Sequence, residues 1–526
     1  MAPDPGHSEF DVVVIGGALA GSSAALLLKR RQPGLRVLVV EKSTTFTRRV
    51  GEATVEISAY FLGRVLGLTQ HLNESHLVKQ GMRFWFANER THNLEDCSEF
   101  GGLYNARVPA YQVDRAVLDE EVLRRARESG AEVWRPASVS SVELLAGGMQ
   151  KLSVRLGEET RAVRARWVVD ASGVTAMLAR QEGWFQSNTA HPTASLWSRW
   201  RGVKDWDGLE LAEKYPKWAT ACHGVRGTAT NHFTGHGWWA WCIPLKGGDV
   251  SIGVVFDQRL VELPEGDSLG ARLKEFLCRH PAAREVLADA HWIEGDVHLR
   301  RNLAYSSTTH AGDGFALVGD ASGFLDPLYS PGMDWVAFTT AGAVELILAQ
   351  QRGEALAPLL EQHNRNFVRA YDRWFEAIYL DKYHYIGEFD LMRTVFLLDL
   401  GLYYLGVASQ PFKFGWKGLL APVFTTPPSV PFYHLMRCYN RRFACIAQAR
   451  RSRGALNRAN DHQRFMFGGY TFSPSSGKPL LKALLSWGWL ELTEGWRTWF
   501  TKPLSAQTAP AIPAPSPAYA MKPAAE

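Results

Sequence analysis

Short apolar runs and helical periodicity alternate along the first 130 residues. Residues 10–15 and 36–40 are apolar runs that predict buried parallel strands. Residues 18–30, rich in Ala and Leu, predict the helix that joins them, and the Pro-Gly pair at 33–34 ends it. A second amphipathic helix is predicted over 114–129. The first three elements form one βαβ unit, the building block of a nucleotide-binding sheet.

Later apolar strands belong to the same predicted sheet. Residues 167–170 and 315–318 are apolar and each leads into a turn, so the sheet is assembled from three separated stretches of chain. Between them, residues 193–257 hold alternating, aromatic-rich runs such as 238–243 and 250–255. That pattern predicts an inserted antiparallel sheet.

The pattern therefore predicts an α/β protein with four regions. After about residue 365 the pattern becomes helical with Pro and Gly interruptions, and the last residues are mostly Ala and Pro, which is typical of disorder. The predicted boundaries are 8–190 with 295–364 for a discontinuous Rossmann-like domain, 191–294 for the inserted antiparallel sheet that forms a substrate domain, 365–504 for the helical region and 505–526 for the disordered tail.

Composition is that of a folded enzyme-sized chain. Of 526 residues, 46% are hydrophobic and 21% charged, and the 19 Trp are unusual, since aromatic side chains line pockets for flat ligands as well as cores. The formal net charge of +5 is too weak to predict a nucleic-acid partner. Six scattered cysteines lack metal-ligand spacing and predict buried free thiols in a reducing compartment, and no metal site is expected.

Targeting signals are not predicted. The N-terminus runs from polar residues 5–9 straight into the first strand, unlike a signal peptide. The longest apolar stretch, residues 395–407, is interrupted by Asp399 and is too short to span a bilayer. We therefore expect a cytoplasmic protein without a transmembrane segment.

The first strand-to-helix turn carries the strongest motif. Residues 16–21 read G-G-A-L-A-G, in which Gly16 permits the tight turn, Gly21 permits close helix packing, and Ala18 and Ala20 lie where the backbone meets a pyrophosphate. The helix N-terminus offers free N–H groups to that anion. Glu41 ends the second strand at the offset of an acid that binds the adenosine ribose. A purely structural tight turn is the simpler explanation, but the strand, helix and acid all favour a dinucleotide.

Further segments resemble the later motifs of the FAD-dependent aromatic hydroxylase superfamily. These are D-A-S-G at 170–173 and G-F-A-L-V-G-D-A at 314–321, with Q-V-D-R at 112–115. The resemblance implies FAD as the cofactor. It also implies that Asp320 contacts the ribityl side of the flavin and that Gln112 and Arg115 contact the flavin as well.

Four more segments resemble flavin-dependent halogenases. They are W-A-W-C-I-P at 239–244, F-L-D-P-L-Y-S-P-G at 324–332, K-Q-G-M-R-F at 79–84 and V-G-E-A-T at 50–54. The resemblance implies that Lys79 is the catalytic lysine, that Trp239 and Trp241 shield the substrate from the flavin, and that Glu52 and Ala53 belong to a strap over the flavin. Reduced FAD would come from a separate flavin reductase.

The chemistry that the resemblance implies requires a group such as Lys79 and a confined path that leads to it. A flavin hydroperoxide and chloride or bromide give hypohalous acid, a small and indiscriminate reagent that must be confined. A lysine ammonium at the end of its path can hydrogen-bond it or carry it as a haloamine beside one ring position. Each part also has a simpler explanation: a lysine is usually solvated, W-x-W rings on one strand face usually fill a core, and Pro-Gly is often only a turn.

Two positions depart from the family. Tryptophan halogenases carry a glutamate where this chain has Tyr329, so we expect an electron-rich phenol or pyrrole, which needs less help from a base. Pro331 stands where an amide contacts halide in some relatives, and proline has no N–H. The halide is therefore assigned to Ser330, Gly332 or Met333.

Alternatives and partners stay open at this level. An FAD monooxygenase or flavin-dependent double-bond reductase would share the cofactor motifs without needing Lys79 or the two tryptophans, and a non-catalytic flavoprotein would use its helical region to bind a partner or a membrane. The helical region carries basic residues that either form a solvated helical face or dock an acidic acyl or peptidyl carrier protein with a tethered substrate. These are Arg437, Arg441, Arg442, Arg450, Arg451, Arg453 and Arg458.

Overall fold

Five parallel strands form the centre of the first sheet, in the order β20-β10-β1-β2-β7. The computed structural model describes residues 8–472 and 477–500. The central strands are β1 (Glu9–Ile15), β2 (Val37–Val40), β7 (Glu132–Trp134), β10 (Glu159–Asp170) and β20 (Phe315–Leu317), and the antiparallel additions are β8 (Ser138–Glu143), β9 (Gln150–Leu156) and β19 (Ala311–Gly312). As the apolar runs predicted, the sheet draws its strands from three separated stretches of chain.

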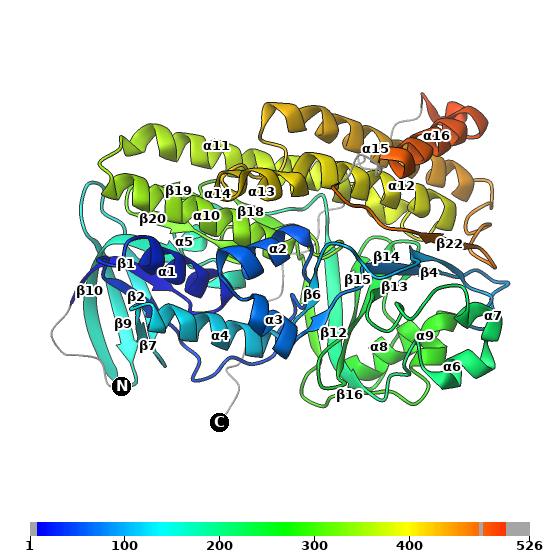
Figure 1. Ribbon diagram of the computed structural model, residues 1–526, viewed down its shortest axis with the longest axis horizontal. Helices are drawn as coiled ribbons and strands as arrows, with labels where there is room; N and C mark the ends of the chain where they lie inside the picture. The colour runs from blue at the N-terminus through cyan, green and yellow to red at the C-terminus, as the bar shows by residue number, and fades with distance from the viewer. Residues whose placement is uncertain (1–7, 473–476, 501–526) are drawn as a thin grey trace.

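The helices beside this sheet also match their predictions closely. The helix α1 (Leu19–Arg31) follows β1, and α4 (Arg115–Glu128) packs against it. The carboxylate of Asp114 caps α4 by accepting a hydrogen bond from the Ala116 amide at 2.9 Å. The long helix α10 (Gly332–Gln351) packs on α1 as well, so these helices cover one face of the sheet (Figure 1), and apolar residues of β8, β9 and α5 (Met177–Gln181) cover the other.

A second, nine-stranded sheet stands beside the first, in the order β16-β12-β15-β14-β13-β4-β5-β22 with β17 on β12. Its strands are β4 (Met82–Phe86), β5 (Ser98–Gly102), β12 (Thr193–Arg201), β13 (Thr230–Gly235), β14 (Trp238–Pro244), β15 (Val250–Asp257), β16 (His291–Trp292), β17 (His298–Arg301) and β22 (Arg464–Phe467). It is antiparallel except where β13 pairs with β4 and β22 pairs with β5.

The nine-stranded sheet uses more of the chain than residues 191–294. Its strands β4, β5 and β17 come from the regions predicted as the Rossmann-like domain, and β22 comes from the predicted helical region. Sequence pattern did not reveal these strands because only tertiary pairing brings them to the sheet edge. The domain boundaries as such stay a prediction, and the predicted tail at 505–526 lies outside the described residues.

Shorter elements complete the two domains. Two small sheets pair β3 (Leu77–Val78) with β6 (Tyr111–Gln112), and β18 (Tyr305–Ser307) with β11 (Phe185–Ser187) and β21 (Gly323–Phe324). The short helices are α2 (Glu56–Tyr60), α3 (Thr69–Ser75), α5 (Met177–Gln181), α6 (Leu209–Lys214), α7 (Pro216–Ala219), α8 (Leu269–Cys278) and α9 (Pro281–Val286). Helices α6 to α9 gather beside the nine-stranded sheet (Figure 1).

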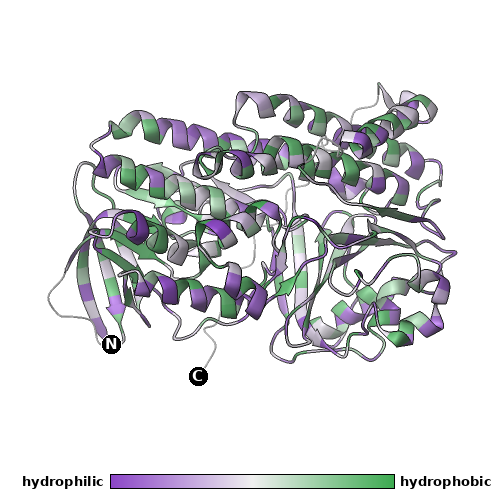
Figure 2. Ribbon diagram, in the orientation of Figure 1, coloured by the Kyte–Doolittle hydropathy of each residue, from purple (hydrophilic) through white to green (hydrophobic). Residues whose placement is uncertain are grey.

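A helical layer lies across both sheets (Figure 1). Besides α10 it contains α11 (Leu356–Trp374), α12 (Phe389–Tyr403), α13 (Ser409–Phe414), α14 (Trp416–Leu419), α15 (Val430–Arg451) and α16 (Gly477–Thr493). Residues on the outer side of α11 are mainly hydrophilic, whereas α10 beneath it is apolar (Figure 2). The amphipathic α11 therefore lies between water and the core helix α10.

Two segments of this layer are long and apolar enough to cross a membrane, by length and composition alone. They are Gly332–Gln351, 89% of whose most apolar window is buried inside the protein, and Phe389–Phe414, with 78%. Such burial is typical of core helices in a globular protein. The second segment contains the apolar stretch that the sequence had indicated.

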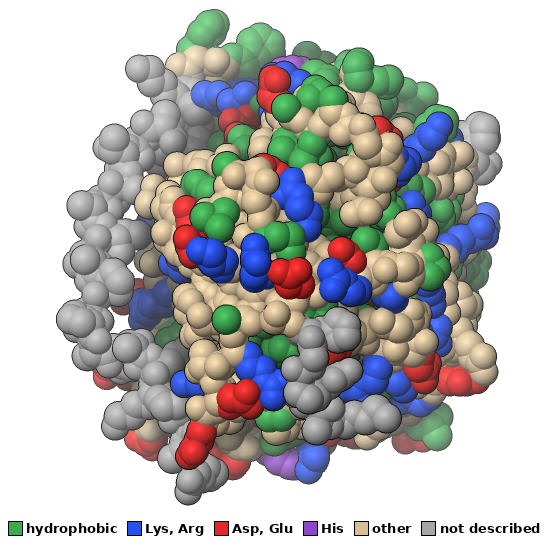
Figure 3. All heavy atoms as spheres, turned by 90° about the vertical axis from the view of Figure 1, so that its left-hand side faces the viewer, with side chains coloured by type: hydrophobic (Ala, Val, Ile, Leu, Met, Phe, Trp, Pro, Cys, Tyr) green, Lys and Arg blue, Asp and Glu red, His purple; other side chains and the backbone are tan. Residues whose placement is uncertain are grey.

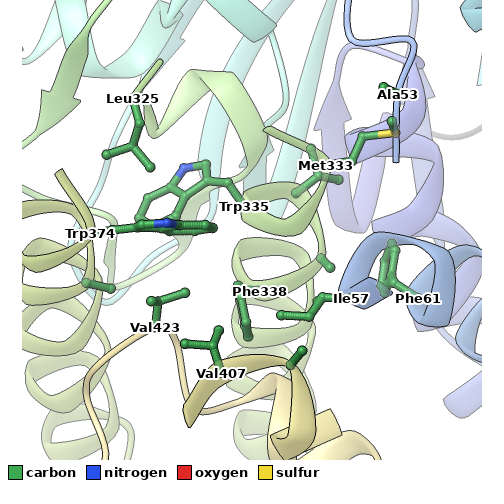
Figure 4. Packing of buried hydrophobic residues seen from close by; sticks show 14 of the residues in the cluster. Ala53, Ile57, Phe61, Leu325, Met333, Trp335, Phe338, Trp374, Val407 and Val423 are labelled. Atoms are coloured by element: carbon green, nitrogen blue, oxygen red, sulfur yellow. The ribbon is translucent and has the colours of Figure 1, made fainter. Parts of the chain in front are cut away.

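One core joins the cofactor-side sheet to the helical layer. Phe338 of α10 lies between Ile57 on one side and Val407 on the other, and Trp335 and Trp374 belong to the same core (Figure 4). All are buried. The helical region is thus packed onto the sheet domain rather than attached by a linker.

The thiols and the surface charge agree in part with expectation. Among the described residues all six cysteines are unpaired, but Cys278 is only partly buried and Cys438 is exposed, because Cys438 faces outward on α15. On the face drawn in Figure 3, basic and acidic side chains lie interspersed.

Candidate active site

The loop after β1 admits only glycine at its two key positions. Gly16 has φ +98°, and a Cβ there would lie 2.5 Å from the Ala171 carbonyl oxygen. A Cβ on Gly21 would lie 1.9 Å from the Gly16 carbonyl oxygen. Contacts below 3 Å are not tolerated by real side chains, so both glycines are required by the close approach of α1 to the sheet.

The start of α1 is open for an anion. Its N-cap residue is Ala18, whose side chain makes no capping bond within the described chain, so the first amides stay available. Both carboxylate oxygens of Glu41 accept backbone bonds, from the Gly17 amide at 2.7 Å and the Ser43 amide at 2.8 Å. Glu41 therefore holds the loop in place. A ribose hydroxyl that bonded to Glu41 would share carboxylate oxygens that already accept these backbone hydrogen bonds.

Asp320 reaches the same place from the far end of the chain. It lies in a 3-10 turn, η3 (Gly319–Ala321), where a Cβ built on Gly319 would meet the Ala20 side chain at 3.1 Å. Burial raises the pKa of the Asp320 carboxyl, and the positive charges of Arg300 and Arg115 oppose that rise. The structure therefore brings the predicted fingerprint and Asp320 together.

Arg115 at the start of α4 acts on the Asp320 carboxylate, and Gln112 lies three residues before it on β6. The Gln112 amide donates to the Thr228 carbonyl at 2.6 Å, and its oxygen is buried without a hydrogen-bond partner among the described groups. Arg115 pairs with Asp119 at 3.0 Å. An orphaned buried acceptor, open helix amides and a glycine cradle fit a bound dinucleotide such as FAD.

Residues 51–54 form a strap that runs from Gln112, in the predicted cofactor site, to Lys79. Glu52 is 2% exposed and pairs with Arg199 at 2.9 Å, yet burial outweighs that pairing and raises the pKa of Glu52. Ala53 bridges to Gln112, and the Thr54 amide donates to the Tyr111 carbonyl at 2.8 Å. The side chain of Met333, at the start of α10, points toward Ala53, and both belong to one buried cluster (Figure 4).

Lys79 lies at the end of that strap. Its ammonium Nζ donates to the Thr54 carbonyl at 3.1 Å, and the residue is only 2% exposed. Burial lowers the pKa of Lys79 to about 8, while the negative charges of Glu56 and Asp334 act to raise it. An ammonium has three N–H donors, so this one keeps two that are not used by Thr54.

A largely apolar cavity opens beside Lys79. Its empty volume is about 720 Å³, including the part open to solvent. The polar side chains that line it include Glu56, Lys79, Tyr329, Asp334 and Asp399. Most of the remaining wall is apolar, and includes Met82, Val108, Trp374, Phe396 and Leu400. Such a mixture is typical of a pocket that holds a flat organic ligand in one orientation.

Asp334 is the group in this cavity that the sequence reasoning missed. Its carboxylate is fully buried and accepts from the Ser58 amide at 2.8 Å and from the Tyr403 hydroxyl at 3.0 Å. Burial raises the pKa of Asp334 to about 7. The sequence signal that could have revealed Asp334 is an acid in the first turn of the otherwise apolar helix α10. A carboxylate in such a buried helix needs hydrogen-bond partners or a functional role.

The segment 324–332 makes a strained turn before α10. Tyr329 and Ser330 have φ +67° and +59°, a region that non-glycine residues rarely adopt. Asp326 holds the turn, since it accepts from the Leu328 amide at 2.9 Å and contacts His191 at 2.8 Å. A Cβ on Gly332 would meet nothing within 4 Å, so open space lies beside the α10 N-terminus, where Ser330, Gly332 and Met333 were assigned to halide.

The tryptophan pair lies near the cavity but not in its wall. Trp239 and Trp241 are buried on β14 with ring centroids 6.0 Å apart. The Trp239 indole donates to the Tyr383 hydroxyl at 2.8 Å, which in turn donates to Asp326 at 2.9 Å. His232 lies 5.7 Å from the Trp239 ring, and its pKa is lowered to about 3 mainly by burial and also by the charge of Lys79. The shielding role therefore stays a proposal.

Comparison with known proteins gives a family match on the cofactor side. Residues 9–198 match the family described as "FAD binding domain". This match confirms FAD as the predicted cofactor.

Curated relatives extend the likeness over most of the chain. It is 26% identical over 413 residues to "Flavin-dependent halogenase chlA" of Dictyostelium discoideum and 28% identical over 381 residues to "Tryptophan 2-halogenase" of Chondromyces crocatus, covering 72% and 70% of this chain. It spans 66% of the length of each of these two relatives. A third relative, "1H-pyrrole-2-carbonyl-[peptidyl-carrier protein] chlorinase" of Pseudomonas fluorescens, is 25% identical, with 71% of this chain and 83% of the relative covered.

Solved structures show the same fold. The structure of halogenase PltM in complex with phloroglucinol and FAD matches with a TM-score of 0.71 and 19% identity, covering 91% of this chain and 96% of that one. The halogenase CmlS matches with a TM-score of 0.56 and 21% identity, covering 92% and 78%. These likenesses confirm the predicted α/β fold class, and with the curated relatives they support the flavin-dependent halogenase family that the motifs resembled.

The buried ammonium gives a prediction about stability. Lowering the pKa of Lys79 from 10.5 to about 8 corresponds to ~3 kcal/mol of destabilisation by the charged form. Lys79→Met removes that cost but leaves the Thr54 carbonyl without its donor, which costs ~1 kcal/mol. We expect Lys79→Met to raise Tm at pH 7. The gain should shrink as the pH rises from about 8 toward 10.5, because the folded protein and then the unfolded chain lose the lysine proton, and a neutral amine is not costly to bury.

Thermal unfolding by circular dichroism at several pH values checks this. The exposed Lys217 on α7 supplies the control, since Lys217→Met should leave Tm unchanged. If the Tm of Lys79→Met at pH 7 is lower than that of the wild type, burial of the ammonium does not destabilise the folded protein and the prediction is wrong.

Proposed function

We propose that this chain is a halogenase that uses reduced FAD, oxygen and chloride or bromide to halogenate an electron-rich aromatic substrate. The observation that carries the proposal is the buried Lys79 ammonium in an apolar cavity, joined by the strap 51–54 to the FAD side. Bound reduced FAD would supply, with oxygen and halide, an oxidised halogen as hypohalous acid. FAD itself would be held by Gly16, Gly21, Gln112, Arg115 and Asp320.

Lys79 would receive and orient that reagent. With one N–H on Thr54, the ammonium has two donors left for the oxygen of hypohalous acid, which polarises the halogen toward the ring. The apolar wall excludes the bulk water and loose nucleophiles with which the reagent would otherwise react. Trp239, Trp241 and His232 would fill the space behind Lys79 and keep substrate away from the flavin, and the halide is proposed to bind at Ser330, Gly332 or Met333.

A phenol is the substrate that this cavity suits best, with a pyrrole as the second choice. The hydroxyl of a bound phenol would give its proton to the Asp334 carboxylate, which the Ser58 amide and the Tyr403 hydroxyl hold in place. The electron-rich ring carbon then bonds to the halogen as the halogen–oxygen bond breaks, and the departing hydroxide takes the ring proton to form water. Asp334 would thus activate the phenol, and the ring proton would need no base at Tyr329.

The arginines of the helical layer bear on whether the substrate is free or bound to a carrier protein. Arg442 pairs with Glu491 at 2.8 Å, and Arg450 pairs with Asp390 at 2.7 Å, so part of the basic set proposed for a carrier protein is engaged internally. We therefore favour a free substrate, with a carrier-bound one as the alternative. A separate flavin reductase would act beside the enzyme in the cytoplasm.

The first experiment supplies reduced FAD and bromide with a panel of phenols, pyrroles and indoles. We expect brominated phenol from the wild type and none from Lys79→Ala, which should still oxidise reduced FAD because the cofactor site is intact. The exposed Lys217→Ala is the matched control with full activity. A hydroxylated product without bromide dependence would favour a monooxygenase, a reduced double bond would favour a reductase, and full bromination by Lys79→Ala would remove Lys79 from the mechanism.

The second experiment follows activity against pH. The pKa of Asp334 near 7 and that of Lys79 near 8 predict that kcat/KM for a phenol rises as Asp334 loses its proton and falls as Lys79 loses its own. Asp334→Asn should lower kcat/KM at least about tenfold and abolish the rising limb. Asp372→Asn is the control, because the pKa of Asp372 is also raised by burial but it does not line the cavity. An unchanged rising limb in Asp334→Asn would exclude Asp334 as the base.

A further inference from the structure

The outward side of α16 is apolar. Leu481, Leu485, Trp489 and Leu492 expose 58, 66, 67 and 69% of their surface. They are four, four and three residues apart, so they lie on one side of the helix. A surface helix normally turns such residues inward, and an exposed apolar stripe of this length indicates a contact with something outside the fold.

The inward side of α16 is held firmly, so the stripe is not an accident of a loose helix. Ala483 is buried, and α16 packs against α12. Near its end, Glu491 pairs with Arg442 at 2.8 Å, and Glu494 pairs with the buried Arg450 at 2.9 Å. The stripe continues into the 3-10 turn η9 (Gly495–Thr498), where Trp496 is 51% exposed.

The charge on this side has one sign. The exposed residues of α16 and η9 include the cations Lys478, Lys482 and Arg497 and no carboxylate. The acids of the same segment, Glu491 and Glu494, are the ones turned inward to arginines. The outward side, which we call the α16 face, therefore combines large apolar side chains with positive charge only.

We propose that the α16 face docks on an anionic lipid surface. Leucines would enter the acyl boundary, Trp489 and Trp496 would lie at the headgroup level, and the lysines would attract lipid phosphates. A second copy of the chain would bring the same three cations and no exposed acid to meet them, so self-pairing is opposed by like charge. A single convex helix also suits a flat, deformable surface. The proposal does not depend on the proposed function.

The test is flotation of the full chain with vesicles. We expect the wild type to float with vesicles that contain phosphatidylglycerol in phosphatidylcholine, and much less with phosphatidylcholine alone. The double variant Leu485→Gln with Trp489→Gln should weaken binding about tenfold or more, because two apolar side chains are lost from the contact. Lys478→Gln with Lys482→Gln should weaken binding to the anionic vesicles and leave the weak binding to phosphatidylcholine unchanged.

A matched control is Leu209→Gln on α6, where an equally exposed leucine (77%) lies far along the chain from α16. Its binding should equal that of the wild type. Circular dichroism of each variant shows whether the fold is kept, as expected for exposed positions. The proposal is overturned if the wild type does not float with either vesicle, if the Leu485/Trp489 variant floats equally well, or if the wild type is a dimer that this variant separates, which assigns the α16 face to a second copy.

Discussion

The burial of one ammonium group against a neutral carbonyl determines how the rest of this site is arranged. Lys79 gives one hydrogen bond to the Thr54 carbonyl, and the negative charges of Glu56 and Asp334 offset only part of the cost of burying its ammonium, so its pKa stays lowered. A second buried lysine shows the contrast: Lys382 is paired with the Asp399 carboxylate at 2.7 Å, although burial lowers its pKa as well. Only the first arrangement leaves an ammonium whose charge is available to a bound reagent.

The surrounding elements serve to keep that group in place and to connect it. The strap 51–54 links Lys79 through Thr54 and Ala53 to Gln112 on the cofactor side. From the other side, Asp326 fixes the turn at Tyr329 and reaches Trp239 through Tyr383, so two of the four motifs that resembled halogenases, 239–244 and 324–332, are joined by hydrogen bonds. The helical layer then closes the cavity with Tyr403 and Leu400 of α12.

Local rules made the cofactor side predictable from the sequence, and tertiary contacts hid the rest. Gly16 and Gly21 are dictated by a turn that closes within a few residues, so their pattern survives in the sequence alone. The strand β22 pairs with β5 across more than three hundred residues of chain, and no local pattern reports that pairing. Asp334 likewise becomes meaningful only when α10 places it beside Lys79. Glu41 stays a predicted ribose ligand, and the structure adds that it also holds the loop through two backbone amides.

The most direct measurement is the titration of the Lys79 side chain itself. In protein labelled at its lysines, the signal that disappears in a Lys79→Arg variant identifies the group, and its chemical shift is followed by NMR as the pH is raised. The account predicts a midpoint at a pH of about 8, because burial in the apolar cavity disfavours the charged amine. A midpoint at the ordinary lysine value of about 10.5 would mean that water solvates the ammonium, and would contradict the account.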